Sequence, residues 1–513
     1  MTDPESKNAA MRPLSGGMLW AAAVVLAAAN FIAILDMTIA NVSVPNIAGG
    51  LAATSSQGTW VITSYAVAEA ITVPLTGWLA ARFGAVRVFV WAMALFGVFS
   101  ALCGMANSLG FLVVARIFQG LSGGPLMALS QTLLLRIFPK EQAAAVGLGA
   151  VTTLVAPVLG PILGGWICDG YSWPWIFYIN LPVALACAIF ARHLLKRYEL
   201  PVERTPIDRV GLILLIVWVG ALQFMLDEGK DLDWFASAKI VTLAIFAAIG
   251  FAAFLIWELT EEHPIVDLSV FRHHGFSASA LTIGLGFAAF FGVNVLTPLW
   301  LQTYMGYTAA AAGQATAWTG VSAVLVAPLA AGLSARIDPR KLVFGGLVWI
   351  GIVTLWRTDA TTDMTYWQIS LPLLTMGLGL PFFVLPLTGL ALASVEEEET
   401  ASAAGLMNFL RTLFGAFATS LVNTAWEDRA TVNHAELVGL VDSDHGLARV
   451  LESSGMSVDS VNATMDRVLT SQSVMLATNE IMWMVGIAFF VAAFAIWLAP
   501  KPTRTVDPSV AGH

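Results

Sequence analysis

The sequence predicts an all-α protein that crosses a membrane many times. Of its 513 residues, 58% are hydrophobic and only 12% are charged, too little polar surface for a protein that folds in water. Apolar runs of roughly 20 residues, the length that spans a bilayer as a helix, follow one another along almost the whole chain. The net charge of −9 argues against a nucleic-acid partner.

Fourteen apolar runs are separated by polar or charged breaks, and we expect each run to form one membrane-spanning helix. The expected spans are residues 18–40, 58–79, 88–106, 109–133, 142–166, 174–195, 207–227, 238–258, 277–300, 312–334, 341–356, 367–392, 401–424 and 477–498.

The positions of the basic residues predict the orientation. Of the 25 Lys and Arg residues, 17 fall in segments that are cytoplasmic if the N-terminus is cytoplasmic, and 6 fall in outside segments. The remaining two, Arg116 and Arg411, lie within spans. Because cytoplasmic loops carry the excess of Lys and Arg, both termini are expected in the cytoplasm.

The chain contains an internal repeat. The loop after the second span reads GWLAARFGAVR (77–87), and the loop after the tenth span reads GLSARIDPRK (332–341). Such repeats are typical of secondary transporters, whose substrate site lies between the halves. The expected domains are a cytoplasmic tail (1–17), a six-helix bundle (18–200), a two-helix insertion (201–262), a second six-helix bundle (263–500) that includes a polar outside loop (425–475), and a cytoplasmic tail (501–513).

Asp36 is an acid within the first span, where a charge costs about 2.5–3.5 kcal/mol and marks a cavity, a partner or an ion pathway. A rise of about 1.5 Å per residue places Asp36 and Arg116, in the fourth span, at similar depths. We expect Asp36 to take up a proton outside and release it inside, with Arg116 tuning that step. A permanent ion pair between the two is the alternative.

A second acid, Glu69, lies near the middle of the second span. Tyr65, Glu69, Thr72 and Thr76 share one face of that helix by their spacing. Glu69 is therefore expected to bind a proton or a cationic drug. The alternative is a protonated side chain that is hydrogen-bonded to a neighbouring helix.

Other polar residues within spans are expected to contribute to a substrate cavity. Arg411 is the only deep cation of the second bundle, and a brace between helices is the alternative for it. The expected cavity residues are Tyr65, Gln119, Asn294, Asn408 and Arg411.

Small residues and prolines in the fifth span are expected to act mechanically. Glycine allows helices to approach closely, and proline removes a backbone hydrogen bond and bends a helix. The residues concerned are Pro157, Gly160, Pro161, Gly164 and Gly165.

The sequence contains no GxxxxGK[ST] nucleotide loop, no metal-ligand cluster and no nucleophile elbow. We therefore expect a transporter that is not an enzyme, has no cofactor and is driven by the proton motive force.

Several motifs, in order along the chain, resemble one family. They are LDMTIANVSVP (35–45), the loop motif with Gly77, Arg82, Gly84 and Arg87, ARIFQG (115–120), APVLGPILGG (156–165) and GLMNFLRTLFG (405–415). Over nearly its whole length the chain resembles the fourteen-helix drug:proton antiporters of the major facilitator superfamily, the EmrB/QacA type, and most closely the EmrB-like pumps. The loop motif has Ala81 where this superfamily usually has an acid.

The resemblance implies a major facilitator fold with a 6 + 2 + 6 arrangement of helices. It implies proton-coupled export of hydrophobic or amphipathic toxic compounds across the bacterial inner membrane. Protons, small hydrophobic drugs and membrane lipid are the implied partners, and EmrB-like pumps work with a periplasmic membrane-fusion adaptor and an outer-membrane channel. Residues 425–475 are a candidate docking site for such an adaptor, and a mobile loop is the alternative. The alternatives are a narrow-specificity exporter or importer of a metabolite or fatty acid, and a non-transporting receptor or scaffold.

Overall fold

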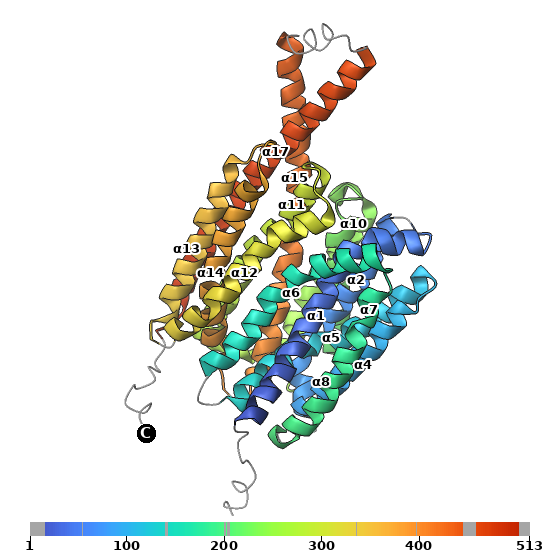
Figure 1. Cartoon of the computed structure of the whole chain (residues 1–513). Helices are drawn as coiled ribbons and strands as arrows, with labels where there is room; N and C mark the ends of the chain where they lie inside the picture. The colour runs from blue at the N-terminus through green and yellow to red at the C-terminus, as the bar shows by residue number, and fades with distance from the viewer. Residues whose placement is uncertain are drawn as a thin grey trace, which may run out of the picture.

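The computed structural model describes residues 16–53, 55–138, 142–199, 202, 206–334, 336–396, 398–444 and 458–501. Within these ranges all regular secondary structure is helical (Figure 1). The expected tails at 1–17 and 501–513 lie almost entirely outside the described residues.

The first half of the chain forms one helical group with its own hydrophobic core. Its helices are α1 (Gly17–Gly50), α2 (Ser55–Thr72), α3 (Thr76–Phe83), α4 (Ala85–Gly104), α5 (Leu109–Ile137), α6 (Gln142–Gly170), α7 (Trp175–Tyr178) and α8 (Asn180–Leu195). Large side chains such as Phe89, Phe96 and Phe177 fill this core and have no exposed surface.

The second half of the chain forms a larger core. Its helices are α9 (Arg209–Glu228), α10 (Ala238–Thr260), α11 (His274–Thr303), α12 (Ala309–Ser334), α13 (Pro339–Trp356), α14 (Tyr366–Ala393), α15 (Thr400–Asp444) and α17 (Val458–Ala495). Phe276, Phe383 and Phe489 are fully buried in this core.

In the described part of the chain, twelve helices are long and apolar enough to cross a membrane. Each of the fourteen expected spans coincides with a helix or a pair of helices. The second expected span is divided into α2 and α3 around Pro74, because proline lacks the backbone amide that a continuous helix requires. The pair α2–α3 and the helix α6 account for the two expected spans beyond the twelve.

The two ends of the bundle are called the terminal face and the hairpin face. α1 begins and α17 ends at the terminal face, whereas α15 and α17 project from the opposite, hairpin face (Figure 1). α15 has 45 residues and α17 has 38, and a bilayer core needs only about 20. Both helices therefore extend beyond the bilayer. Most of 425–475, which we expected to be a loop, is helical, and 445–457 lies outside the described residues.

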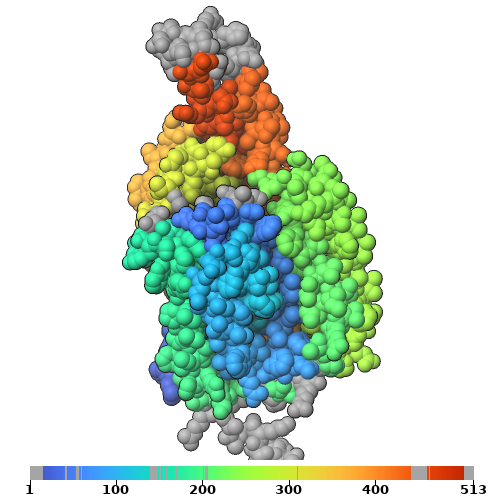
Figure 2. All heavy atoms as spheres, turned by 90° about the vertical axis from the view of Figure 1, so that its right-hand side faces the viewer, coloured from blue at the N-terminus to red at the C-terminus, as the bar shows by residue number. Residues whose placement is uncertain are grey.

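The pair α9–α10 belongs to the second half, and α9 also packs against the first half. α9 contacts α2 of the first half and α15 of the second. At the hairpin face the pair is tied to α15, since Trp234 Nε1 donates to Thr424 Oγ1 at 3.0 Å and Lys230 forms an ion pair with Glu427 at 2.5 Å. Figure 2 shows this green helix pair beside the blue helices of the first half.

Candidate functional site

Asp36 lies in a buried hydrogen-bond network inside the first half. Arg116 Nη1 on α5 lies 2.6 Å from Asp36 Oδ2, and only 2% of Asp36 and none of Arg116 is exposed. Gln119 Nε2 and Asn180 Nδ2 both donate to Asp36 Oδ1, at 3.0 and 2.5 Å. Because all three partners are donors, this arrangement suits an ionised Asp36 carboxylate.

Arg116 is held from several sides. Its Nε donates to Val61 O of α2 at 3.1 Å, and its Nη1 also donates to Gln119 Oε1 at 2.9 Å. The guanidinium lies over the ring of Tyr65, 4.1 Å from the ring centroid. Among the described residues, Arg116 Nη2 and the Tyr65 hydroxyl have no hydrogen-bond partner. The two atoms are therefore available to a group that enters this region.

A second layer of polar side chains fixes the network. Asn180 on α8 also donates to Ser100 Oγ at 2.9 Å, and Ser100 donates to Phe177 O at 2.9 Å. Cys103 Sγ on α4 donates to Gln119 Oε1 at 3.4 Å. Sequence reasoning missed Asn180, Ser100 and Cys103, because no spacing rule connects residues of separate helices that meet only in the fold.

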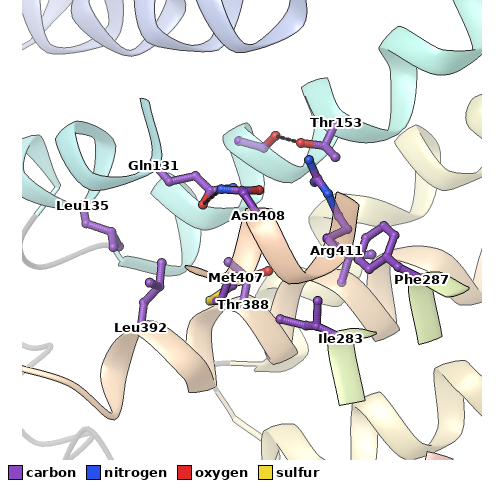
Figure 3. A pocket seen from close by; sticks show the side chains of 12 residues that line it. Gln131, Leu135, Thr153, Ile283, Phe287, Thr388, Leu392, Met407, Asn408 and Arg411 are labelled. Atoms are coloured by element: carbon purple, nitrogen blue, oxygen red, sulfur yellow. Dashed lines mark hydrogen bonds between the residues drawn. The ribbon is translucent and has the colours of Figure 1, made fainter. Parts of the chain in front are cut away.

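A cavity lies between the two halves, toward the terminal face. α5 and α6 of the first half and α11, α14 and α15 of the second line it, and its volume is about 30 Å³ in this conformation. Its polar lining includes Gln131, Thr153, Asn408 and Arg411, which Figure 3 shows around one space. Asn408 Nδ2 lies 3.4 Å from Gln131 Oε1 and so connects α15 to α5.

The rest of the cavity wall is mainly apolar. The residues include Leu135, Ile283, Phe287, Val384, Leu392 and Met407. An apolar wall with a few polar groups is the usual composition of a site for small organic ligands.

Arg411 is the cation of this cavity. Its Nη2 contacts the sulfur of Met127, and its guanidinium lies 5.4 Å from the ring centroid of Phe287. No carboxylate in the described part of the chain lies within ion-pair distance of it. The charge of Glu69 acts on Arg411 from a longer distance.

Glu69 is half-buried on α2 and forms no hydrogen bond or ion pair with any described residue. Its neighbours on the predicted polar face use their hydroxyls internally: Thr72 Oγ1 donates to Ala68 O at 2.7 Å and Thr76 Oγ1 to Val73 O at 2.6 Å. Glu69 is thus an acid of this face without a polar partner among the described residues.

The five residues expected in the substrate cavity lie in different places. Asn408 and Arg411 line the cavity. Tyr65 and Gln119 belong to the Asp36 network instead. Asn294 Nδ2 donates to Phe290 O at 3.0 Å within α11, and Asn294 is not part of the cavity lining.

The loop motif joins the two halves at the terminal face. A Cβ added at Gly77 would lie 2.0 Å from Ser402 Oγ and 2.9 Å from Ser402 Cα, so α3 and α15 approach each other too closely for a larger residue. Gly405 makes a similar approach to Val73 O. Arg82 lies over the rings of Trp78 and Phe83.

Glu199, which lies outside the loop motif, binds the N-terminus of the helix that follows the motif. It accepts hydrogen bonds from the backbone amides of Val86 and Arg87, at 3.1 and 3.0 Å, in the first turn of α4. Gly84 has φ +93°, and a Cβ there would meet the Glu199 carboxylate. An acid at a helix N-terminus is favourable because the free amides and the helix dipole both attract it.

The second repeat loop stabilises its helix with its own acid. Asp338 Oδ1 accepts a hydrogen bond from Arg340 N at 3.0 Å, and Arg340 Nη2 lies 2.7 Å from Asp338 Oδ2. These hydrogen bonds from Arg340 lower the pKa of the Asp338 carboxyl below its ordinary value.

The glycines of the fifth expected span differ in their surroundings. A Cβ at Gly160 would lie 2.1 Å from Thr38 Oγ1, and one at Gly164 would lie 3.2 Å from Ile39 O, so both allow α6 to pack closely on α1. A Cβ at Gly165 would meet nothing within 4 Å. Pro157 is half-buried, and the side chain of Pro161 lies outside the described residues.

Two repeated helical halves with a cavity between them and buried charges within them define a secondary transporter. Residues 26–419 match the family described as the Major Facilitator Superfamily. The chain belongs to this superfamily.

Comparison with curated proteins shows similarity over nearly the whole length. The chain is 40% identical over 497 residues to the Multidrug export protein EmrB of Escherichia coli, covering 96% of this chain and 97% of that protein. It is 43% identical over 495 residues to the Fatty acid resistance protein FarB of Neisseria gonorrhoeae, covering 96% and 98%.

Solved structures show the same fold. One is the proton:xylose symporter XylE, with a TM-score of 0.58 at 14% identity, covering 94% of this chain and 96% of that chain. Another is the human organic anion transporter MFSD10, with a TM-score of 0.58 at 13% identity, covering 94% and 100%.

Proposed function

We propose that this protein is a proton-coupled antiporter that exports hydrophobic or amphipathic toxic compounds across the bacterial inner membrane. The observation that carries the proposal is the cavity between the two halves, with its mostly apolar wall. Similarity to multidrug export proteins over 96% of the chain supports the substrate class.

We propose fourteen membrane spans in a 6 + 2 + 6 order, with both termini in the cytoplasm. The terminal face is then cytoplasmic and the hairpin face is periplasmic. In this arrangement α9 and α10 form the two-helix insertion (201–262) between the bundles 18–200 and 263–500. The basic residues of the predicted cytoplasmic segments support this orientation.

The proton motive force supplies the energy in this proposal, and no cofactor is needed. One proton that moves through 100 mV releases about 2.3 kcal/mol, and each pH unit adds about 1.36 kcal/mol. Together they sustain a concentration ratio of several hundred-fold per proton, since about 1.4 kcal/mol corresponds to a factor of ten.

Asp36, Arg116 and Glu69 are the proposed coupling residues. Protonation of Asp36 would remove the negative charge that pairs with Arg116 and would place an O–H donor among three groups that donate to this carboxylate, so it requires the Arg116 network to rearrange. Glu69 has no such partners among the described residues, and the charge of Arg411 acts on it. Proton transfer at Asp36 and proton transfer at Glu69 would therefore be linked to two different movements of the protein.

The loop motif and the fifth-span motif are the proposed gate. Gly77 packs against α15, and Gly160 and Gly164 pack α6 against α1. Arg82, Gly84 and Arg87 shape the turn between α3 and α4, while Pro157, Pro161 and Gly165 belong to the α6 segment. We propose that these contacts open and close the terminal face during transport.

Everted membrane vesicles energised to an acid interior provide the test. A panel of lipophilic cations, uncouplers and weak acids is added, and substrate-induced proton release is followed with a pH-sensitive dye. Asp36→Asn and Glu69→Gln are measured beside wild type and beside Arg429→Gln, a change at an ion pair with Glu480 near the hairpin face.

Each outcome has a separate meaning. Proton release by wild type that is lost in Asp36→Asn assigns coupling to Asp36, and release lost only in Glu69→Gln assigns it to Glu69. No release by wild-type protein with any compound would contradict the multidrug exporter and favour a narrow substrate.

We also propose that the helical projection of α15 and α17 binds a periplasmic membrane-fusion adaptor, which connects to an outer-membrane channel. The projection extends beyond the length that a bilayer accommodates and carries exposed charged residues such as Asp428 and Glu436. Replacing 430–472 by a short Gly-Ser linker is expected to abolish co-purification of the adaptor. An adaptor that still co-purifies would contradict docking at this projection.

A further inference from the structure

We propose that Asp208 and Glu258 bind a hydrated Mg²⁺ ion at the terminal-face end of the α9–α10 pair. The site contains none of the residues that we propose for proton coupling or for the substrate cavity, so the inference does not depend on the proposed transport function. Three features of the structure support it. Two carboxylates face one another, N–H donors hold both of them in the ionised form, and no basic side chain in the described part of the chain neutralises them.

The carboxylates of Asp208 and Glu258 meet beside Gly211, in the first turn of α9. A Cβ added at Gly211 would lie 2.1 Å from Asp208 Oδ2 and 2.4 Å from Glu258 Oε1. The two oxygens are therefore close together, on the same side of the α9 backbone. Asp208 precedes α9 and Glu258 lies in the last turn of α10, so no spacing pattern within one segment of the sequence indicates this pair.

The other oxygen of each acid is already held by N–H donors. Asp208 Oδ1 accepts hydrogen bonds from two backbone amides in the first turn of α9, at 3.1 and 2.9 Å. Glu258 Oε2 accepts one from Val266 N at 3.1 Å. Trp257 Nε1 donates to both oxygens of Asp208, at 3.1 and 3.0 Å. Such donors favour ionised carboxylates, and they fix the direction of the oxygens as outer groups do around metal ligands.

Glu258 Oε1 needs a positive partner. Glu258 is only 4% exposed, and its Oε1 has no hydrogen-bond partner among the described residues. No Lys, Arg or His in the described ranges lies within ion-pair distance of Asp208 or Glu258. The charges that act on Glu258 are those of Asp208 and Glu261, and both are negative. Because a buried carboxylate without compensation is costly, a cation between the two acids stabilises this part of the protein.

The chemistry of the ligands favours Mg²⁺. Carboxylate oxygens suit hard divalent cations, and Mg²⁺ commonly keeps several water molecules while one or two carboxylates bind it. Among the described residues no group of three or more His, Cys, Asp and Glu side chains could hold a metal ion. Two carboxylates with water as the remaining ligands are therefore the coordination that we propose.

A cation at this position would connect the three segments that join the two-helix insertion to the bundles. Asp208 ends the connection from the first bundle, Glu258 lies at the end of α10, and Val266 lies in the connection to the second bundle. Without the cation, two negative charges face one another at Gly211 and repel. The ion would thus hold the insertion in place where it enters and leaves the fold.

Tb³⁺ luminescence tests the site, because this ion takes the same oxygen ligands and is excited through a nearby indole ring, here that of Trp257. Full-length protein in nanodiscs of uncharged lipid is titrated with Tb³⁺, and Mg²⁺ is then added as the competitor. In parallel, thermal unfolding is measured with and without Mg²⁺. Empty nanodiscs give the background.

The variants remove either acid or the space between them. They are Asp208→Asn, Glu258→Gln and Gly211→Ala, whose added methyl group would meet both oxygens. The control is Glu228→Gln, which removes an acid from an ion pair at the other end of α9.

Wild-type protein is expected to show Tb³⁺ emission that Mg²⁺ removes. Mg²⁺ is also expected to raise its unfolding temperature, since a ligand that binds only the folded protein stabilises it. Each of the three variants is expected to bind Tb³⁺ at least about tenfold more weakly and to lose the effect of Mg²⁺ on unfolding. The control Glu228→Gln is expected to behave like wild type in both measurements.

Three results would overturn the inference. One is a wild-type protein without Mg²⁺-sensitive Tb³⁺ emission, a result that needs no variant to fold. Another is emission that Asp208→Asn and Glu258→Gln retain with the wild-type affinity, which would assign the ion to other acids. The third is an unfolding temperature that Mg²⁺ does not change but Glu258→Gln raises, which would show that the two acids share a proton instead of a metal ion.

Discussion

Arg116 on α5 and Asp36 on α1 form an ion pair at 2.6 Å from which solvent is almost completely excluded. Breaking a buried pair leaves one charge without compensation, whereas removing both charges avoids that penalty. The stability of single and double variants therefore reports on this ion pair independently of any role in transport.

We expect Arg116→Gln to destabilise the detergent-solubilised protein by about 3–5 kcal/mol, because it leaves Asp36 ionised among too few donors. The double variant Asp36→Asn/Arg116→Gln is expected to be more stable than Arg116→Gln alone. Thermal unfolding followed by intrinsic fluorescence measures both. Additive losses in the double variant would show that the two side chains act independently.

Glu69→Gln is expected to leave stability unchanged within about 0.5 kcal/mol, or to raise it slightly. The reason is that Glu69 has no hydrogen-bond or ion-pair partner among the described residues. The same unfolding assay measures this, with Asp36→Asn as the contrasting change. A large loss of stability in Glu69→Gln would indicate a structural partner and support the alternative of a hydrogen-bonded acid.

Gly77→Val is expected to weaken closure of the terminal face, since even one added carbon would lie 2.0 Å from Ser402 Oγ. Thr388, which lines the cavity, is replaced by cysteine in a background without Cys103, Cys168 and Cys187. A membrane-impermeant maleimide is then added to everted vesicles. The rate at which it alkylates Thr388→Cys reports access to the cavity from the terminal face. We expect faster alkylation in Gly77→Val. Gly332→Val, where an added Cβ meets nothing within 4 Å, is the control.

Gly160→Ala and Gly165→Ala form a matched pair within α6. The added methyl at position 160 collides with Thr38, and the one at position 165 lies in open space. Overpacking of this kind costs about 1–3 kcal/mol, so we expect Gly160→Ala to lower both the unfolding temperature and the transport rate. Gly165→Ala should match wild type in unfolding temperature. Equal behaviour of the two variants would mean that α1 and α6 adjust to each other more freely than their contacts suggest.

Asp338→Asn is expected to destabilise the protein at neutral pH by about 0.5 kcal/mol, because asparagine can still cap the helix but loses the ion pair with Arg340 and the attraction of a negative charge to the helix N-terminus. Because hydrogen bonds from Arg340 lower the pKa of Asp338 in the folded protein, its ionised form contributes stability above the unfolded pKa of about 4. That contribution is lost as the pH falls through the folded pKa. The difference between wild type and Asp338→Asn should therefore shrink in unfolding experiments at acid pH.

The sequence predicts the helices well and their contacts only in part. Apolar runs of the right length mark the twelve helices of the described chain that are long and apolar enough to cross a membrane, because the bilayer imposes a fixed length on each helix. The count of fourteen spans stays a prediction. The partnership of Asp36 with Arg116 follows from depth alone, since few charges lie within spans. Asn180 and Ser100 have no such signal, because a polar residue in a helix gives no indication of which neighbour it faces.

The residues of the cavity wall also show that local sequence patterns do not predict which helices a side chain faces. Asn408 and Arg411, expected in a substrate cavity, lie in the wall of the cavity between the halves. A role of either residue in substrate binding stays a prediction. Polarity alone also predicts Tyr65 and Gln119 in the cavity, but in the structure both side chains face Arg116. No local pattern indicates Glu199, because its contact with α4 depends on how a later segment returns to the first repeat loop.

α15 runs without interruption from Thr400 to Asp444. Arg411 in the cavity and the far end of the projection are therefore joined by one stiff rod about 50 Å long. A tilt of about 10° around the cavity would sweep the distal end sideways by about 9 Å. A tilt of α15 caused by ligand binding in the cavity would therefore move a protein bound to that end. A protein that holds the end of α15 in place would in turn slow the transport cycle.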